Sequence, residues 1–389
     1  MSLLAPGSEN EAADMVRAAR ARKAALVIEG GGTRAGLGRP VQAESVLSTR
    51  ALSGIVFHEP AELVIRARAG TPLAAIEASL AAHGQMLPFE PMDHRAIYGV
   101  EGEPTIGAIA ACNISGPRRI FGGAARDALI GLRFVNGLGE IIQSGGRVMK
   151  NVTGLDLVKL SAGAHGTLGL IAEVTFKLLP RPQVERTLAL RGLDDKTAIA
   201  ALTAGLGSQY SVTGAAHLPG GVTGLRLEGF AESVSYRGAR LTELLAPHGR
   251  AAWMDDGEAA AYWRDIRDAR PLAAPREAAL WRISAPPTRG PKIVADIARE
   301  RAARWFYDWG GGLIWLATPE ADEAGAAIVR AAAAAAHGYA TLVRASDALR
   351  QSAHVFQTPS EVEMRLSNAV KASVDPDRLL NPGRMYAGV

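Results

Sequence analysis

Apolar residues recur along the chain with two spacings, one typical of amphipathic helices and one typical of strands. Near the N-terminus, the capping-box pattern of residues 8–11 predicts a helix that runs to about Ala21. The apolar run of residues 24–30 follows and predicts a buried strand that ends at Gly30. A glycine-rich loop comes directly after this strand, so the chain opens with a helix, a strand and a loop.

A second strand and helix are predicted in residues 63–84. Polar and apolar residues alternate in 63–70, which indicates a half-buried strand. Thr71 then stands at the N-cap position of a helix, Pro72 at its first position and Gly84 at its end. The order of elements is therefore strand, helix and strand again.

Glycines lie among short apolar runs from Thr105 to Pro182, which indicates a mixed α/β core. The Asn136-Gly137 pair stands between two of these runs and predicts a β-hairpin. The stretch ends at Pro180-Arg181-Pro182, where two prolines lack the amide that would continue a strand or helix. We therefore expect a domain boundary at Pro182.

The composition changes after this boundary, because all six tryptophans lie between residues 183 and 350. Strand-like patterns in 221–230 and 311–318 alternate with helical patterns in 235–249 and 320–338. A second α+β domain with its own aromatic core is the simplest interpretation.

Trp305 and Trp309 stand four residues apart, a spacing that forms one stripe on a helix. Such a stripe either binds a partner or belongs to the core of the second domain. We favour the core, because large aromatic side chains usually anchor packing.

The composition is that of a globular protein, with 48% apolar and 21% charged residues in a chain of 389. The net charge of +4 comes without a basic block, which disfavours nucleic acid as a partner. A single cysteine, Cys112, excludes an internal disulfide, and the start of the chain has too short an apolar run for a signal peptide. Glycines and polar residues interrupt the uncharged stretch 197–225, so no transmembrane segment is expected. These features favour a cytoplasmic protein.

Residues 30–38, GGGTRAGLG, follow the first predicted strand and present several backbone amides to a ligand. A diphosphate is the natural ligand of such a loop. Residues 30–35 also match the G-x-G-x-x-A pattern of Rossmann dinucleotide folds. Glycines and a proline in 36–40 nevertheless break the helix that this fold requires, and no acidic ribose ligand stands in 49–53. A tight surface turn without a ligand remains the other interpretation.

Three further regions have the same character, since glycines and small hydroxyl residues stand beside apolar runs. They are residues 104–107 with 113–117, residues 163–169, and residues 381–384. Such segments let the backbone approach a flat ligand closely.

The series GGGTRAGLG, TIGAIAACNISGPRR, GAARDALIGLRFVNGLGEII, GGRVMKNVTGLDLVKLSAGAHGTLGLIAEVTFKLLPRP and LLNPGRMY resembles the FAD-binding subunits of bacterial glycolate oxidases. These subunits belong to the vanillyl-alcohol-oxidase type of flavoproteins, with a PCMH-type FAD-binding domain. The resemblance is dense over residues 24–182 and clear over the last 15. It implies an α+β protein with a PCMH-type FAD-binding domain of two α/β subdomains in 1–182, an α+β cap domain in 183–355, and a C-terminal segment, 356–389, that returns to the FAD domain.

The resemblance also implies which residues bind FAD, because each matches a position of the family's motifs. These residues are Gly30, Gly31, Gly32, Thr33, Arg34, Gly38, Thr105, Gly107, Asn113, Ser115, Gly116, Asp127, Gly166, Thr167, Gly169, Ile171 and Asn381. The pyrophosphate loop contains neither histidine nor cysteine, so we expect non-covalent FAD. Cys112 is a candidate attachment point, but a lone cysteine in an apolar segment is more typical of a small buried hydrophobic residue.

The reaction implied by the resemblance is the oxidation of glycolate or a related 2-hydroxy acid to the 2-oxo acid, with electrons passed to a partner. Competent relatives carry closely paired histidines, whereas the eight histidines here are dispersed, and we assign no catalytic residue and no metal ligand. Arg118, Arg119, Arg384 and Tyr386 stand in the flavin motifs and either orient a carboxylate or pair with phosphates and acidic residues.

A sister flavoprotein subunit and an iron–sulfur subunit are the expected partners, since one cysteine cannot hold a cluster. The alternatives are a self-sufficient FAD-dependent alcohol or hydroxy-acid oxidoreductase, a flavin-free structural subunit, and an NAD-binding Rossmann enzyme.

Overall fold

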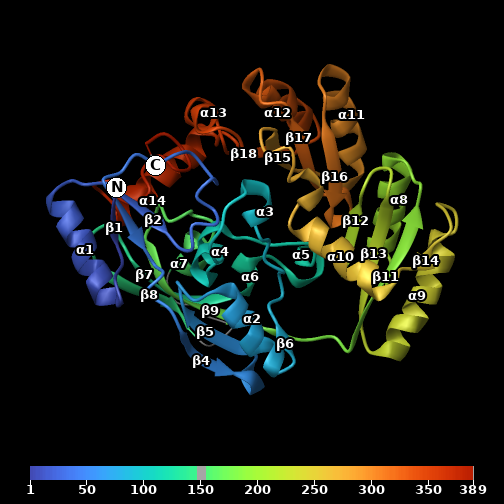
Figure 1. The fold of residues 1–389 in the computed structure, drawn as a ribbon, viewed down its shortest axis with the longest axis horizontal. Coiled ribbons are helices and arrows are strands. Elements are labelled where there is room, and N and C mark those ends of the chain that lie inside the picture. Colours follow the sequence, from blue (N-terminus) through green and yellow to red (C-terminus); the bar gives the residue numbers. More distant parts are fainter. Residues whose placement is uncertain (147–154, 389) are drawn as a thin grey trace.

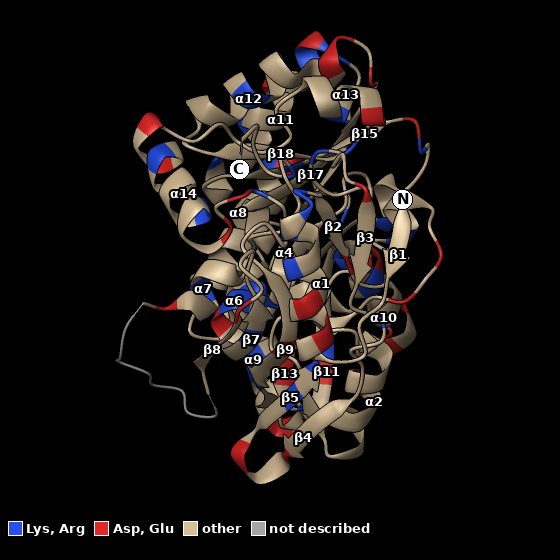
Figure 2. Cartoon of the chain, turned by 90° about the vertical axis from the view of Figure 1, so that its left-hand side faces the viewer, with Lys and Arg blue, Asp and Glu red and all other residues tan. Residues whose placement is uncertain are grey.

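The computed structural model describes residues 1–146 and 155–388, which form two lobes side by side (Figure 1). The first lobe contains the N-terminal part of the chain, in blue to green, and the C-terminal end, in red. The second lobe, in yellow-green through yellow to orange-red, is built from the middle of the chain. Residues 147–154, which form part of the family motif quoted above, lie outside the described residues. Both signs of charge are mixed over the ribbon (Figure 2).

A small parallel sheet and helix α1 (Glu9–Ala21) form one corner of the first lobe. The strand order is β1-β3-β2, with β1 at Ser2–Leu4, β3 at Ser45–Ser48 and β2 at Leu26–Glu29. The predicted capping box begins the helix, since the side chain of Ser8 accepts a hydrogen bond from the Glu11 amide at 3.2 Å. The predicted first helix and first strand are confirmed.

An antiparallel sheet of five strands forms the rest of the first lobe, in the order β4-β5-β9-β7-β8. Its strands are β4 (Ile55–Glu59), β5 (Val64–Arg68), β9 (Leu170–Lys177), β7 (Leu129–Val135) and β8 (Ile141–Gly145). Strands β7 and β8 pair around the Asn136-Gly137 turn, as predicted. The connecting elements are α3 (Arg95–Tyr98), α4 (Ile106–Cys112), α5 (Arg119–Gly122), α6 (Ala125–Ala128), α7 (Leu157–Ser161) and the paired short strands β6 (Gln85–Met86) and β10 (Leu179–Pro180).

The predicted N-cap of the second helix is wrong. Helix α2 (Leu73–Ala82) has Pro72 at its N-cap position, and no side chain caps it. The Thr71 hydroxyl instead donates to the Arg68 carbonyl at 2.7 Å and accepts from the Gly54 amide at 2.9 Å. This side chain therefore closes the turn between β5 and α2, a role that local sequence does not distinguish from capping.

An eight-stranded sheet forms the cap lobe, in the order β14-β11-β13-β12-β16-β17-β15-β18. Its strands are β11 (Val184–Arg191), β12 (Gly214–His217), β13 (Val222–Gly229), β14 (Ala252–Trp253), β15 (Ala279–Ser284), β16 (Arg304–Asp308), β17 (Leu313–Thr318) and β18 (Tyr339–Arg344). Its outer face packs on helices α8 (Asp195–Leu206), α9 (Ala231–Leu245), α11 (Gly290–Glu300) and α12 (Ala326–Ala335). Helix α10 (Asp256–Arg267) and the first lobe cover the other face.

The predicted helical stripe of Trp305 and Trp309 is wrong, because Trp305 belongs to strand β16 and Trp309 follows in a short 3₁₀ turn. Alternate residues of a strand point to opposite faces. Trp305 accordingly packs against the outer core of the cap, whereas Phe306 and Trp309 belong to the core shared with the first lobe.

The C-terminal segment returns to the first lobe after α13 (Asp347–Ser352) and α14 (Glu361–Val374) (Figure 1). Leu380 forms a parallel bridge to Leu26 of β2. The fully buried ammonium of Lys371 donates to the carbonyls of Thr167 and Leu380, at 2.6 and 2.9 Å, and to Asp375 at 2.7 Å. The arrangement of sheets and helices confirms the predicted α+β class.

Candidate functional site

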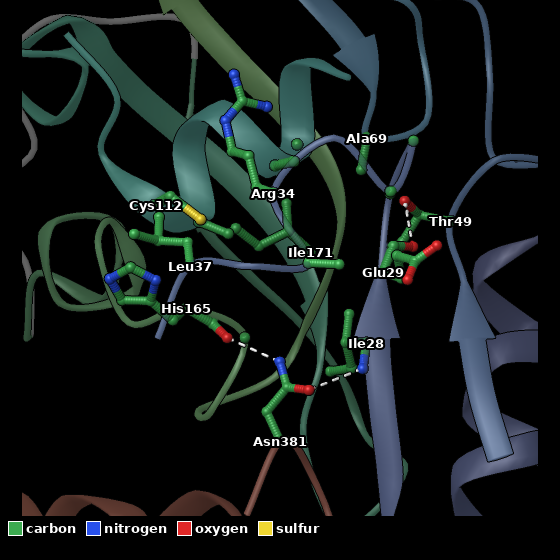
Figure 3. Close-up of a pocket in the computed structure, with 18 of the residues that line it drawn as sticks. Ile28, Glu29, Arg34, Leu37, Thr49, Ala69, Cys112, His165, Ile171 and Asn381 are labelled. Atoms are coloured by element: carbon green, nitrogen blue, oxygen red, sulfur yellow. Dashed lines mark hydrogen bonds between the residues drawn. The ribbon is translucent and has the colours of Figure 1, made fainter. Parts of the chain in front are cut away.

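One cavity lies where the glycine-rich segments of the first lobe converge (Figure 3). It holds about 710 Å³ of empty space, its open mouth included. The end of β2 and its loop, helix α4, the segment before β9 and the C-terminal segment all contribute to its walls. The lining residues are Ile28, Glu29, Gly30, Gly31, Gly32, Thr33, Arg34, Ala35, Leu37, Thr49, Ala69, Gly107, Ala108, Ala111, Cys112, His165, Gly166, Gly169, Ile171, Asn381 and Arg384.

Close backbone packing explains the glycines of the loop after β2. A Cβ atom on Gly31 would lie 1.6 Å from the carbonyl oxygen of Glu103, and one on Gly30 would lie 2.3 Å from Oγ1 of Thr105. Gly32 has a φ of +77°, which L side chains rarely adopt. The loop therefore sits against the start of α4, and its glycine amides carry no side chain that would keep an extended anionic ligand away.

Asn381 fixes the C-terminal segment to two of the other walls. Its Oδ1 accepts a hydrogen bond from the Ile28 amide at 2.9 Å, and its Nδ2 donates to the His165 carbonyl at 2.7 Å (Figure 3). Because these two walls are 137 residues apart in the chain, one buried amide side chain holds together segments that have no local connection.

Two arginines supply positive charge to the cavity. Arg34 is buried, with Nη2 bonded to the Met92 carbonyl at 3.0 Å, and its Nε and Nη1 have no partner among the described residues. Arg384 donates from Nη1 to the Leu37 carbonyl at 2.9 Å, and its Nε is likewise unpartnered there. Burial lowers the pKa of both guanidinium groups, which stay charged at neutral pH. Glu29 is the one acidic side chain of the lining, so the walls favour an anion.

Cys112 and His165 lie together on one side of the cavity, opposite Glu29 and Thr49 (Figure 3). Burial raises the pKa of the Cys112 thiol. Burial, together with the smaller effect of the nearby Arg384, lowers the pKa of His165 to about 4. The His165 ring packs against Phe356 at a centroid distance of 5.0 Å. Both side chains are therefore neutral at physiological pH.

Ten of the seventeen predicted FAD-binding residues line this cavity. They are Gly30, Gly31, Gly32, Thr33, Arg34, Gly107, Gly166, Gly169, Ile171 and Asn381. The seven others, which do not line it, are Gly38, Thr105, Asn113, Ser115, Gly116, Asp127 and Thr167. The structure thus brings all four predicted segments to one place.

The residues outside the lining hold the walls in position. Asn113 Oδ1 accepts from the Arg126 amide and Ser115 Oγ from the Ala125 amide, both at 2.9 Å. The Asp127 carboxylate accepts from the Ala124 amide at 2.8 Å and so caps the start of helix α6. These three polar side chains therefore orient the turns around α4, and their contacts are internal to the protein.

The sequence patterns missed several lining residues, among them Thr49, Ala69, Ala108 and Ala111. Helical spacing gives a signal for the alanines of α4, because positions 107, 108, 111 and 112 lie on one face of a helix. Thr49 and Ala69 belong to no motif, and only the packing of β3 and β5 beside the loop brings them to the cavity.

Arg118, Arg119 and Tyr386 lie outside the lining. Arg118 forms ion pairs with Glu90 and Glu228 at the junction of the lobes. Tyr386 packs against Phe356 at a centroid distance of 6.1 Å.

Within residues 1–146 and 155–388, no group of three or more His, Cys, Asp or Glu side chains is placed to hold a metal ion. Across the same ranges, no helix is both long and apolar enough to cross a membrane.

A family model described as an FAD-binding domain matches residues 2–145. The chain is 36% identical over 374 residues to "Glycolate oxidase subunit GlcE" of Escherichia coli strain K12, covering 96% of both chains. It is 27% identical to a D-2-hydroxyglutarate dehydrogenase of Xanthomonas citri pv. viticola, covering 99% of this chain and 89% of that one.

Solved structures share the fold at low sequence identity. The chain aligns with 4-ethylphenol oxidase from Gulosibacter chungangensis at a TM-score of 0.73 and 14% identity, covering 99% of this chain and 89% of that one. It aligns with an alkyldihydroxyacetonephosphate synthase at a TM-score of 0.71 and 15% identity, covering 98% of this chain and 76% of that one. The predicted PCMH-type fold is confirmed.

Proposed function

From the premise that this chain belongs to the PCMH-type family of FAD-binding oxidoreductases, with FAD as its cofactor, we propose that it is the FAD-binding subunit of a glycolate-oxidase-type complex. Its reaction is the oxidation of glycolate or a related 2-hydroxy acid to the 2-oxo acid, with electrons passed to a partner. The observation that carries this proposal is the 36% identity over 96% of both chains to a glycolate oxidase subunit.

The cavity of the first lobe is the proposed FAD site. Its glycine loop offers backbone amides without side chains, and the free nitrogens of Arg34 and Arg384 match the charge of a diphosphate. Leu37, Ile171 and the alanines of α4 offer apolar contacts for a flat ring system. When bound, FAD supplies a hydride acceptor for the substrate carbon and a store for the two electrons.

We further propose that FAD binds without a covalent link. The loop 30–38 contains no histidine or cysteine, although Cys112 and His165 line the cavity. The raised pKa of the buried Cys112 thiol disfavours the thiolate. Acid precipitation of the holoprotein should release all flavin into the supernatant, and flavin that stays with the polypeptide would contradict this part of the proposal.

Electron transfer out of the chain requires a partner under this proposal. The sequence holds one cysteine, whereas an iron–sulfur cluster takes four ligands that are usually cysteines. A sister flavoprotein subunit and an iron–sulfur subunit fit this requirement, since the relative in E. coli is itself named as a subunit.

The test is anaerobic mixing of the flavin-loaded chain with glycolate, D-lactate and D-2-hydroxyglutarate, alone and within the complex. We expect the visible flavin absorption to bleach, with fast turnover to an artificial acceptor only in the complex. Fast turnover by the isolated chain would favour a self-sufficient dehydrogenase, the second candidate, which the similarity to D-2-hydroxyglutarate dehydrogenase over 99% of the chain supports. A protein that takes up no FAD would overturn both.

A further inference from the structure

Two arginines from different lobes meet at one tryptophan outside the cavity. Arg119 begins helix α5 of the first lobe, and its Cζ lies 4.7 Å from the centroid of the Trp309 ring. Arg282 lies on strand β15 of the cap, and its Cζ lies 5.0 Å from the same centroid. Both distances fit cation–π contacts. The lobes therefore bring two guanidinium groups and an indole together where their surfaces face one another.

Trp309 is held rigidly between the lobes. Its Nε1 donates to the Gly116 carbonyl of the first lobe at 3.1 Å, and its backbone amide donates to Asp308 Oδ1 at 2.7 Å. The side chain is buried, with 9% exposure, and the residue has a φ of +52°. A bulky residue in this conformation is uncommon. The ring thus forms a fixed apolar wall beside the two cations.

The two guanidinium groups differ from their neighbours in their ion pairs. Neither Arg119 nor Arg282 forms an ion pair with an acidic side chain of the described residues, whereas Arg118 and Arg226 each pair with Glu90 and Glu228. Burial lowers the pKa of Arg282. Tyr339 acts in the opposite direction, whereas the positive charge of Arg119 adds to the lowering. Asp308 forms no ion pair with either arginine, and because burial raises its pKa to about 7 its carboxyl group is only partly ionised at neutral pH.

This cationic pair adjoins the end of the cavity that holds Arg34. His94 is buried beside α3, and Met92, two residues before it, accepts the hydrogen bond from Arg34. Burial, Arg34 and the more distant Arg282 lower the pKa of His94 to about 3, so its ring is neutral. The Tyr98 hydroxyl donates to the Val343 carbonyl of β18 at 2.7 Å, and a Cβ atom on Gly36 of the glycine-rich loop would lie 2.7 Å from the Tyr98 ring. Since β18 pairs with β15, Arg282 lies on the strand next to the one that contacts the Arg34 loop.

We propose that Arg119 and Arg282 form the subsite that binds the carboxylate of the substrate, with Trp309 as its apolar wall. This inference rests on the proposed function, which makes the substrate a small 2-hydroxy acid. A guanidinium group matches a carboxylate with two parallel N–H donors, and such charge-assisted bonds are strong where water is excluded. Both arginines are half-buried and no acidic side chain of the described residues pairs with them, so a bound carboxylate would supply the opposite charge that the fold leaves out. Both arginines bind the substrate, and neither transfers a proton.

Binding of oxalate, a carboxylate without an oxidisable carbinol, tests the subsite separately from the chemistry. The flavin-loaded chain, or the complex, is titrated with oxalate by calorimetry and by the change in flavin absorption. We expect Arg282→Met to weaken oxalate binding about 10- to 100-fold and Arg119→Met about tenfold, since hydrogen bonds to charged groups are among the strong ones. Arg282→Lys keeps the positive charge but not the two parallel N–H donors of the guanidinium group, so it should bind oxalate more tightly than Arg282→Met but less tightly than the wild type.

Discrimination between glycolate and glycolamide gives a second readout. The wild-type protein should prefer the acid, and Arg282→Met should lose most of that preference while its FAD content stays unchanged. The matched control is Arg299→Met, because Arg299 is an exposed cap residue whose ion pair among the described residues is with Asp296. If Arg282→Met does not fold, Arg119→Met and Arg282→Lys carry the same test.

The outcomes separate the subsite from the proposed function. Oxalate that binds the arginine variants as tightly as the wild type, or does not bind the wild type, overturns the subsite even where glycolate reduces the flavin. Arginine-dependent oxalate binding without flavin reduction by any 2-hydroxy acid supports the subsite and contradicts the proposed function.

Discussion

Two arginine–tryptophan centres lie on the face of the cap sheet that meets the first lobe, and they differ in how their charge is balanced. The Arg226 guanidinium lies over Trp263, 4.6 Å from the ring centroid, and donates to both carboxylate oxygens of Glu90 at 2.8 and 2.9 Å. Arg282 contacts Trp309 in a similar way but pairs with no carboxylate of the described chain. The first centre is internally compensated, and the second leaves positive charge available to a ligand.

The adjacent residues Arg118 and Arg119 divide between these two centres. Arg118 joins the Glu90–Arg226 network through Glu228, whereas Arg119 lies over Trp309. Burial alone would raise the pKa of Glu90, yet Arg226 and Arg118 lower it to about 2. The residue type alone therefore does not show whether an arginine stabilises the fold or is available to a ligand. The ion pairs that the arginine forms within the fold make that distinction.

Arg226→Met should have the largest effect, on stability. The substitution removes the fully buried Arg226 and leaves the half-buried Glu90 and the nearly buried Glu228 with too little positive charge, and losing one partner of a buried pair costs about 3–5 kcal/mol. Denaturant unfolding followed by fluorescence measures this loss. A loss below about 1 kcal/mol would show that the network is not the support described here.

Asp308→Asn should change the pH dependence of stability. The carboxyl group has a native pKa of about 7 against an ordinary 3.8, so between these values the native state holds a proton that the unfolded state has lost. Its contribution to stability therefore falls as pH rises from about 4 to 7.

The asparagine variant should be less sensitive to that rise, and the two proteins should differ by about 1–3 kcal/mol between pH 5 and pH 8. Unfolding curves at both pH values give the difference. Glu185, whose pKa burial raises to about 7, remains in both proteins and cancels in the comparison. Parallel pH profiles for the two proteins would contradict the prediction.

Arg34→Met should weaken FAD binding by about tenfold, because Arg34 is buried, its Nε and Nη1 have no partner among the described residues, and it lines the proposed cofactor site. Reconstitution of the apoprotein, followed by quenching of FAD fluorescence, measures the dissociation constant. The dissociation constant of Arg34→Lys for FAD should lie between those of Arg34→Met and the wild type, and that of Arg299→Met should equal the wild-type value. Equal affinities for all four proteins would remove Arg34 from the cofactor site.

The sequence was sufficient for the class of fold and for the convergence of four glycine-rich segments, because glycines such as Gly31 are dictated by local backbone packing. It was not sufficient for the contacts between the lobes. Trp305 and Trp309 have a spacing typical of a helix, but residues 304–308 form a strand because they pair with β17. Trp309 and Arg282 are 27 residues apart and meet Arg119 only through the docking of the lobes, which no local pattern encodes.

Arg282→Met should leave the free energy of unfolding of the ligand-free chain within about 1 kcal/mol of the wild type, the smallest effect expected. The substitution removes a half-buried cation without leaving a carboxylate unpaired, and a well-packed apolar side chain of similar length is often neutral or stabilising at such a position. Measured beside Arg226→Met, this result separates the two centres, since one arginine would matter for folding and the other for carboxylate binding. A loss as large as that of Arg226→Met would instead make Arg282 a structural residue and remove the contrast between them.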